Sequence, residues 1–460
     1  MRTIPVCVVG AGSSGIVACK VLRERGVPFA CFELGSGIGG NWRYGNDNGM
    51  SSAYRSLHIN TNRNVMAYSD YPMPESYPIY PSHADVLDYF EDYVDHFGIR
   101  DDVEFRTRVE HVEPLAGGGF EVTVRRVDVG EVEVIRTESV IVANGHHWSP
   151  SLPSWPGTFS GEIIHSHDYK TPHVLTDRRV VVVGVGNSGT DIVTEAVRHA
   201  EATFLSVRRG AHIVPKYVFG VPTDSLLKPV LTRLPHVLQR SGFAALLRIA
   251  RGRQEDYGFP TPDYPFGSEH PTISSHLLDH VGHGRITVKP TIERLDGDHV
   301  VFADGTKETA DIIVAATGYK VNVPFLMPEV FDPAGNRVEL FCHVAHLEVP
   351  GLYFVGLVQP LGATMPLAEA QSEWVADLVT GTAGLPAHGV MREAVDKTLA
   401  AIQKRYTKSP RHTIQVDFYP YLRTIARERR RGRRRPKAQV VSMEVSEGAE
   451  VRRHGGREAA

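Results

Sequence analysis

The chain has 460 residues, of which 42% are hydrophobic and 22% are charged, and its formal net charge is −3. This length predicts two or three domains with an ample core, and the composition is that of an ordinary soluble globular protein. The small net charge gives no general argument for a nucleic-acid or membrane partner. The sequence has no run of about 18 apolar residues that would predict a membrane span. Its first strand begins too close to Met1 to leave room for a signal peptide. We therefore expect a cytoplasmic protein.

A glycine-rich turn between a strand and a helix stands at the start of the chain. The apolar strand at residues 6–9 is followed by glycines in the G-x-G-x-x-G spacing. These glycines allow a tight turn, close approach of backbone to a pyrophosphate and close helix–strand packing. The next helix presents unpaired N–H groups to phosphate. The second strand, residues 29–32, ends on a carboxylate that can accept hydrogen bonds from a ribose. We interpret this unit as an FAD site formed by Gly10, Gly12, Ser13, Ser14, Gly15 and Glu33.

The same pattern occurs again at residues 180–207. Its turn contains the fingerprint residues Gly184, Gly186, Asn187, Ser188 and Gly189. Val207 follows Gly184 at the same spacing as Glu33 follows Gly10, and Arg208 and Arg209 come next. A site with two guanidinium groups and no carboxylate favours a 2′-phosphate, so we interpret this unit as an NADPH site. The alternative is that one unit is a decayed copy. The complete fingerprints favour two working sites.

The first unit is followed by a long polar and aromatic segment at residues 54–81. Loops of this length in a compact protein are usually functional, although an Asn in a loop is more often a turn residue. Residues 82–97 predict a helix with Ser82 as N-cap and Asp85 three positions later. Residues 103–112 and 120–124 predict two strands joined by a glycine-rich turn.

Two similar apolar strands at residues 139–145 and 311–318 end in small-residue turns. We interpret them as the points where the chain leaves and re-enters its first domain. The predicted fold class is therefore α/β, with two Rossmann-like dinucleotide-binding domains. The predicted FAD-binding domain is discontinuous, at residues 1–149 and 321–420, and the inserted NADPH-binding domain covers residues 150–320.

The remaining segments carry weaker signals. Residues 220–253 are rich in Leu, Val and Pro and predict two or three packed helices, with a lid or substrate-tunnel wall as the alternative. A helix near residues 367–378 could direct its N-terminus at the flavin. Residues 421–440 hold nine Lys and Arg against one Glu, so we predict a basic, disordered tail at 421–460. The four cysteines include no CxxC pair, and we expect them to be reduced and buried.

The segment between the two units contains Phe159, Gly161, His165 and Tyr169. This spacing resembles the F-x-G-x-x-x-H-x-x-x-(Y/F) fingerprint of flavin-containing monooxygenases. The related Baeyer–Villiger monooxygenases usually carry Trp at the last position. Residues 315–319 resemble the family's FATGY motif with Ala for Phe, and residues 40–44 and 359–362 resemble two further segments. We interpret His165 as architectural rather than catalytic.

The resemblance implies an enzyme in which NADPH reduces FAD and O2 adds to the flavin C4a. Bound NADP+ would protect the resulting hydroperoxide, and an amine nitrogen or sulfide sulfur would take one oxygen atom. No side-chain acid or base is needed for that transfer, because the cofactor carries the chemistry. Asn60 would be the catalytic residue and would hydrogen-bond the flavin adduct and the nicotinamide side. The other cofactor-binding residues implied by the resemblance are Gly40, Asn41, Trp42, Thr61, Thr317, Gly318 and Gln359.

Other functions remain open at this point. A Baeyer–Villiger monooxygenase acting on ketones would share the cofactors, and Tyr169 counts against it. An NADPH-dependent flavin reductase or electron-transfer partner is disfavoured by the fingerprint, and a nucleic-acid-binding flavoprotein would depend on the basic tail. As partners we expect O2 and a small-molecule substrate, with no metal and no membrane span. Nucleic-acid binding is disfavoured, and the sequence is compatible with a homo-oligomer.

Overall fold

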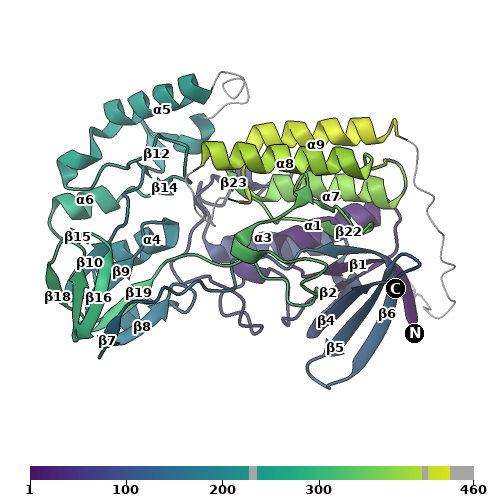
Figure 1. Ribbon diagram of the computed structural model, residues 1–460, viewed down its shortest axis with the longest axis horizontal. Coiled ribbons are helices and arrows are strands. Elements are labelled where there is room, and N and C mark those ends of the chain that lie inside the picture. The colour runs from purple at the N-terminus through teal and green to yellow at the C-terminus, as the bar shows by residue number, and fades with distance from the viewer. Residues whose placement is uncertain (227–235, 407–412, 436–460) are drawn as a thin grey trace, which may run out of the picture.

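The computed structural model describes residues 1–226, 236–406 and 413–435, and two sheets whose central strands are parallel lie side by side in it (Figure 1). The first sheet is built from the two ends of the described chain and the second from its middle. The helices are α1 (Ser13–Glu24), α2 (Arg63–Met66), α3 (His83–His96), α4 (Asn187–Ala196), α5 (His236–Arg251), α6 (Leu277–Gly282), α7 (Met365–Val379), α8 (His388–Arg405) and α9 (Phe418–Gly432).

The first sheet has the order β20-β21-β22-β6-β1-β2-β3, with the strands β4 and β5 attached to β6. Its strands are β1 (Arg2–Val9), β2 (Phe29–Phe32), β3 (Val103–Glu104), β4 (Thr107–Pro114), β5 (Phe120–Arg126), β6 (Val132–Val142), β20 (Leu340–Phe341), β21 (Ala345–His346) and β22 (Leu352–Phe354). Strand β1 pairs in parallel with β2 on one side and β6 on the other. The carboxyl end of β1 is therefore a topological switch point, where ligands of open α/β sheets bind.

The second sheet repeats this arrangement around β9, with the order β15-β10-β9-β19-β8. Strand β9 pairs in parallel with β10 and β19. Its strands are β8 (Glu162–His165), β9 (Arg179–Val183), β10 (Ala202–Ser206), β15 (Thr287–Lys289) and β19 (Ile312–Ala315). Both predicted nucleotide-binding units are thus present in an α/β fold, as the sequence predicts. The domain limits at residues 150 and 320 stay a prediction.

Short strands complete the described structure. A small sheet of order β18-β17-β16-β7 contains β7 (Gly157–Phe159), β16 (Ile292–Gly297), β17 (His299–Phe302) and β18 (Lys307–Thr309). Three two-stranded pairs are β11 (Ile213–Val214) with β14 (Thr272–Ile273), β12 (Tyr217–Val218) with β13 (Val221–Pro222), and β23 (Gln359–Leu361) with β24 (Gln415–Asp417). The last pair brings the C-terminal segment against residues that follow the first sheet.

Several local predictions are confirmed. Helix α3 begins after Ser82, which forms a capping box with Asp85, and Val86, Phe90 and Val94 on its apolar face are buried. The predicted strand at residues 103–112 is divided into β3 and β4, with Arg106 at a φ of 52° between them. Cys7, Cys19 and Cys31 are buried free thiols, and Cys342 is partly buried. In the stretch 220–253 the structure describes one α-helix, α5, while residues 227–235 lie outside the described residues.

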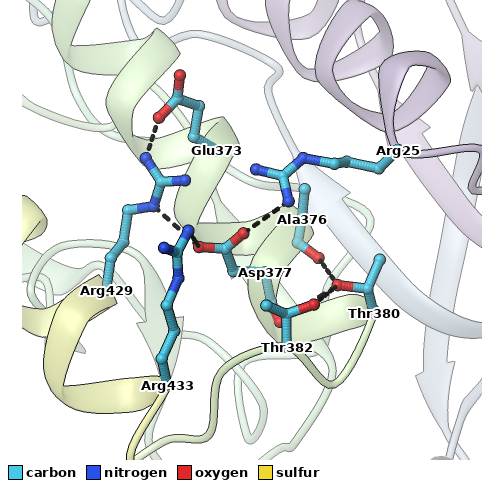
Figure 2. Close-up of polar contacts among 8 residues, drawn as sticks. All are labelled: Arg25, Glu373, Ala376, Asp377, Thr380, Thr382, Arg429 and Arg433. Carbon is cyan, nitrogen blue, oxygen red and sulfur yellow. Dashed lines mark hydrogen bonds and ion pairs between the residues drawn. The ribbon is translucent and has the colours of Figure 1, made fainter.

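The prediction of a disordered tail from residue 421 is wrong for its first part, because helix α9 continues to Gly432 and packs on α7. Figure 2 shows the reason: the fully buried carboxylate of Asp377 on α7 faces three arginines. Arg429 and Arg433 on α9 lie 3.0 and 3.1 Å from one carboxylate oxygen, and Arg25 at the end of α1 lies 3.0 Å from the other. Residues 436–460 of the predicted tail lie outside the described residues.

Charge pairing explains why the arginine-rich segment is ordered. Burial by itself would raise the pKa of Asp377, but the hydrogen bonds and charges of Arg429, Arg433 and Arg25 lower it below its usual value. Arg429 also pairs with Glu373, one turn earlier on α7 (Figure 2). Arg429 and Arg433 of α9 therefore neutralise the buried Asp377 rather than lying wholly in solvent.

Candidate functional site

The two glycine turns have the same hydrogen bonds. Gly10 N–H donates to the Phe32 carbonyl at 2.8 Å, and Gly184 N–H donates to the Ser206 carbonyl at 3.0 Å. Each of these glycines has a φ near +100°, at 99° and 103°, which favours glycine. A Cβ at Gly15 would lie 1.7 Å from the Gly10 carbonyl oxygen, so a side chain there would force the turn to open.

The second turn has the same constraint, since a Cβ at Gly189 would lie 2.1 Å from the Gly184 carbonyl oxygen. Helices α1 and α4 both start without a side-chain cap, at Gly12 and Gly186. Their first N–H groups therefore point at the space beyond the carboxyl ends of β1 and β9. This arrangement fits a pyrophosphate at each turn.

The acid at the end of β2 lies directly beside the first turn. Glu33 is 4% exposed, and its carboxylate accepts hydrogen bonds from the backbone N–H of Ala11 at 2.8 Å and Gly35 at 2.7 Å. The Asn48 amide also donates to it, at 3.1 Å. These bonds leave the carboxylate oriented at the position where an FAD ribose is expected.

A second glycine-rich loop covers the first turn. Gly39 N–H donates to the Ala11 carbonyl at 3.1 Å, and a Cβ at Gly40 would lie 3.0 Å from Gly12 Cα. Asn41 accepts hydrogen bonds from the Ser52 N–H and hydroxyl, both at 2.8 Å, so its side chain fixes the loop. Trp42 packs against the core of the first domain. The glycines of the loop and of the first turn form a cradle without side chains. This leaves room for a ligand to contact the backbone, which fits FAD.

Two further contacts connect Ser13 and Ser14 to distant segments. The Ser13 carbonyl accepts a hydrogen bond from the Tyr68 hydroxyl at 2.6 Å. A Cβ at Gly356 would lie 2.0 Å from the Ser14 hydroxyl oxygen, so only glycine fits there. Sequence reasoning missed Tyr68 and Gly356, because each is brought to the turn by tertiary packing alone.

At the second unit, the two arginines after β10 differ. Val207 is 5% exposed, so the acid position of the first unit is occupied by a buried apolar side chain. Arg209 forms an ion pair with Glu269 and lies over the Tyr264 ring, with 5.9 Å from Cζ to the ring centroid. Arg208 is exposed and forms no ion pair with any residue that the structure describes. Arg208 is therefore the arginine that fits a 2′-phosphate.

The fingerprint histidine has a structural role. His165 is 1% exposed, and its Nδ1 accepts a hydrogen bond from His167 N–H at 3.0 Å. Its Nε2 therefore carries the proton and donates to the Gly318 carbonyl at 3.0 Å. Burial lowers the pKa of His165, which keeps the ring neutral. The Thr317 hydroxyl donates to the Ser151 carbonyl at 2.6 Å, and this bond holds the residues that follow β19 in place.

The fingerprint tyrosine lies in the second unit and shares its acceptor on α4 with the long loop of the first unit. The Tyr169 hydroxyl, fully buried, donates to Glu195 at 2.6 Å, and the Ser56 hydroxyl donates to the same oxygen at 2.9 Å. The Tyr54 hydroxyl donates to Asp191, one turn earlier on α4, at 2.5 Å. Burial raises the pKa of Asp191. Residues 54–56 of the long loop are thus attached to the helix that begins at the second glycine turn.

A cavity of about 230 Å³ lies beside Asn60 and Thr61. Its walls are mostly apolar and come from the loop after β2, the segments around α5 and the start of α9. The Asn60 side chain makes no hydrogen bond to any residue in the described ranges, which leaves its amide available to a ligand. Gln359 is absent from this wall: its N–H donates to the Ile414 carbonyl at 2.8 Å, and the following Leu361 and Gly362 line the cavity instead.

Lysine 216 is a wall residue that sequence reasoning missed. Lys216 Nζ lies 3.4 Å from the Ile59 carbonyl, directly before Asn60, and 5.0 Å from the centroid of the Tyr80 ring. Burial lowers its pKa, and the charge of Asp191 opposes that effect. No signal in the sequence distinguishes this lysine from surface lysines, because its position depends on how β12 meets the long loop.

Within the described residues, no group of three or more His, Cys, Asp or Glu side chains could hold a metal ion. Among those same residues, no helix is both long and apolar enough to cross a bilayer.

Comparison with known proteins identifies the family. The family model described as flavin-binding monooxygenase-like matches residues 4–436. The chain belongs to this family. It is 35% identical over 441 residues to flavin-containing monooxygenase 5 of Rattus norvegicus, covering 92% of this chain and 82% of the relative. It is 31% identical over 441 residues to flavin-containing monooxygenase 2 of Homo sapiens, with the same coverage of both chains.

Solved structures give the same result for the fold. S-allyl-L-cysteine S-oxygenase from Allium sativum matches with a TM-score of 0.70 and 27% identity over 93% of this chain and 88% of its own. A closed structure of cyclohexanone monooxygenase matches with a TM-score of 0.71 over 94% and 98%, and at 20% identity this likeness shows the fold alone. The protein is a flavin-dependent monooxygenase, and FAD and NADPH are its cofactors.

Proposed function

We propose that this monooxygenase transfers one oxygen atom of O2 to an amine nitrogen or a sulfide sulfur of a small molecule. The observation that supports this most directly is the largely apolar cavity lined by Asn60, a residue of the loop that is bonded through Tyr54 and Ser56 to the helix of the second turn. The fingerprint also has its tyrosine form, at Tyr169. An S-oxygenase is among the related structures, which agrees with a soft nucleophile as substrate.

In this proposal each unit holds one cofactor. The cradle of Gly10, Gly12, Gly40 and Glu33 binds FAD, and the second turn with Arg208 binds NADPH. When bound, the two cofactors would supply two electrons from NADPH and an activated form of O2, of which one atom would go to the lone pair of the substrate and the other would leave as water. The chain's own residues orient the two cofactors and exclude water.

Asn60 is the residue we place at the reaction. Its amide can donate and accept at once, and it lies at the junction of the cavity with the first domain. We expect Asn60→Ala to retain FAD but to divert NADPH oxidation from product to hydrogen peroxide. Product and peroxide measured per NADPH consumed would check this. Full coupling in the variant would remove Asn60 from the mechanism.

The function itself is tested by mixing NADPH-reduced enzyme rapidly with oxygenated buffer, without substrate, while the flavin spectrum is followed. A long-lived species that absorbs like neither the reduced nor the oxidised flavin is expected. Amines and sulfides should discharge it faster than ketones. Discharge by ketones alone would indicate a Baeyer–Villiger enzyme, and direct return to oxidised flavin with release of peroxide would contradict an oxygenase.

A further inference from the structure

The wall of the cavity beside Asn60 carries two groups of polar residues. Lys216 and Asp224 line it together with Asn60, and the Asp224 carboxylate accepts two hydrogen bonds from Asn62, at 2.7 and 2.8 Å. Arg240 of α5 also lines it and donates to the Ser268 hydroxyl at 2.6 Å. A substrate that presents its reacting atom to Asn60 would therefore share the cavity with the Arg240 guanidinium.

Apolar side chains line the same cavity. Val214 of β11 pairs with Ile273 of β14. Phe243 lies one turn after Arg240 on α5, and its ring centroid is 4.8 Å from that of Phe266. These four side chains belong to one cluster and all line the cavity. A ligand that fills this cavity therefore needs an apolar or aromatic part.

The formal charges of the wall do not balance. Arg405 is paired with Asp417 through both guanidinium Nη atoms, one of them at 2.7 Å, so these two charges cancel. Lys216 and Asp224 supply one charge of each sign near Asn60. Arg240 has no carboxylate partner among the residues that the structure describes, and it donates to a neutral hydroxyl, that of Ser268. A partly buried guanidinium with one neutral partner is stabilised when a ligand supplies an anion.

We propose that Arg240 binds an anionic group of the substrate, so that the preferred substrates are amines or sulfides that carry a carboxylate beyond an apolar spacer. This inference rests on the proposed function and adds the substrate class. Arg240 would act in binding, remote from the oxygen transfer. A phosphate of NADPH is the other anion that could use the same guanidinium, and the experiment separates the two.

The test uses two aryl methyl sulfides that differ at the far end, 4-(methylthio)benzoate and its methyl ester. We expect the wild-type holoenzyme to prefer the carboxylate in kcat/KM for sulfoxide formation. Arg240→Gln should reduce that preference about 10- to 100-fold, because a charge-assisted hydrogen bond is replaced by a neutral one. Arg240→Lys should restore part of it. Arg248→Gln removes the same charge from an exposed position of the same helix and should leave the preference unchanged.

The outcomes separate the inference from the function. An unchanged preference in Arg240→Gln, with FAD content and thermal midpoint equal to wild type, would overturn the substrate class while the proposed function stands. A raised KM for NADPH with no change in preference would assign the guanidinium to the cofactor and overturn the inference as well. Oxygenation of neither sulfide by the wild type, with peroxide as the product, would contradict both proposals.

Discussion

The two nucleotide-binding units of this protein share the backbone of the glycine turn, and they differ in the side chain that follows the second strand. The N–H groups that follow β2 and β10 both continue the parallel pairing: Glu33 donates to Glu104 at 3.0 Å and Val207 donates to Lys289 at 2.8 Å. The side chains at this shared position are a carboxylate held by three donors and a buried valine. The backbone of the turn is the same in both units. We therefore expect the side chains that follow the second strand of each unit to decide which cofactor binds there.

The helices that start at the two turns also have different neighbours. The end of α1 is paired through Arg25 with Asp377, and so with α9. Helix α4 is attached through Asp191 and Glu195 to tyrosines and a serine of other segments. The first unit is thus braced by the C-terminal helix, while the second is connected to the loop that leads to Asn60.

The largest effects should come from adding one carbon atom to either turn. Gly15→Ala should abolish FAD binding, because its Cβ would lie 1.7 Å from the Gly10 carbonyl oxygen. Gly189→Ala should keep FAD but prevent flavin reduction by NADPH. Overpacking of this kind costs about 1–3 kcal/mol or more. Flavin absorbance per protein and stopped-flow reduction would measure both effects.

A matched control exists in the first domain, at Gly117, where an added Cβ would meet nothing within 4 Å. Gly117→Ala should leave FAD content and reduction as in wild type. If Gly189→Ala lost FAD as completely as Gly15→Ala, the assignment of one cofactor to each unit would be wrong.

A smaller effect is expected from Arg208, which follows Val207 at the position that corresponds to the residue after Glu33. Arg208→Ala should raise the KM for NADPH about 10- to 100-fold and leave that for NADH nearly unchanged, since a charge-assisted contact contributes about 1.5–3 kcal/mol. Arg209→Ala is the matched control, because Arg209 is already paired with Glu269. Equal changes for the two nucleotides in Arg208→Ala would remove this residue from the 2′-phosphate site.

The smallest effect concerns the connection between the units. Tyr169→Phe removes one of two hydroxyls that donate to Glu195, at a cost of about 1.5 kcal/mol, while the Ser56 hydroxyl remains. FAD content should stay constant, the thermal midpoint should fall by a few degrees, and flavin reduction should slow. A variant that reduces at the wild-type rate would show that this hydrogen bond stabilises the fold without positioning NADPH.

Features that depend on short stretches of chain could be predicted well. The two turns, the capping box of α3 and the strands β6 and β19 follow from local spacing and strand patterns, and the structure contains all of them. The prediction of a disordered tail from residue 421 was wrong for α9, because a run of arginines is expected to be solvated unless its counterions are known. Asp377 and Glu373 lie more than 50 positions away in the chain and become counterions only through the packing of α9 on α7.

The sequence alone determined the fold class, because glycine spacing acts within one βαβ unit. Its assignment of FAD to the first unit and NADPH to the second stays a prediction. The sequence also placed Asn60 and Arg208 as candidates. Only the tertiary structure showed that Arg209 is already paired, that His165 donates from Nε2 to a backbone carbonyl, and that Lys216 and Arg240 line one cavity. These properties depend on desolvation and on contacts between distant segments, and neither is encoded at a fixed spacing along the chain.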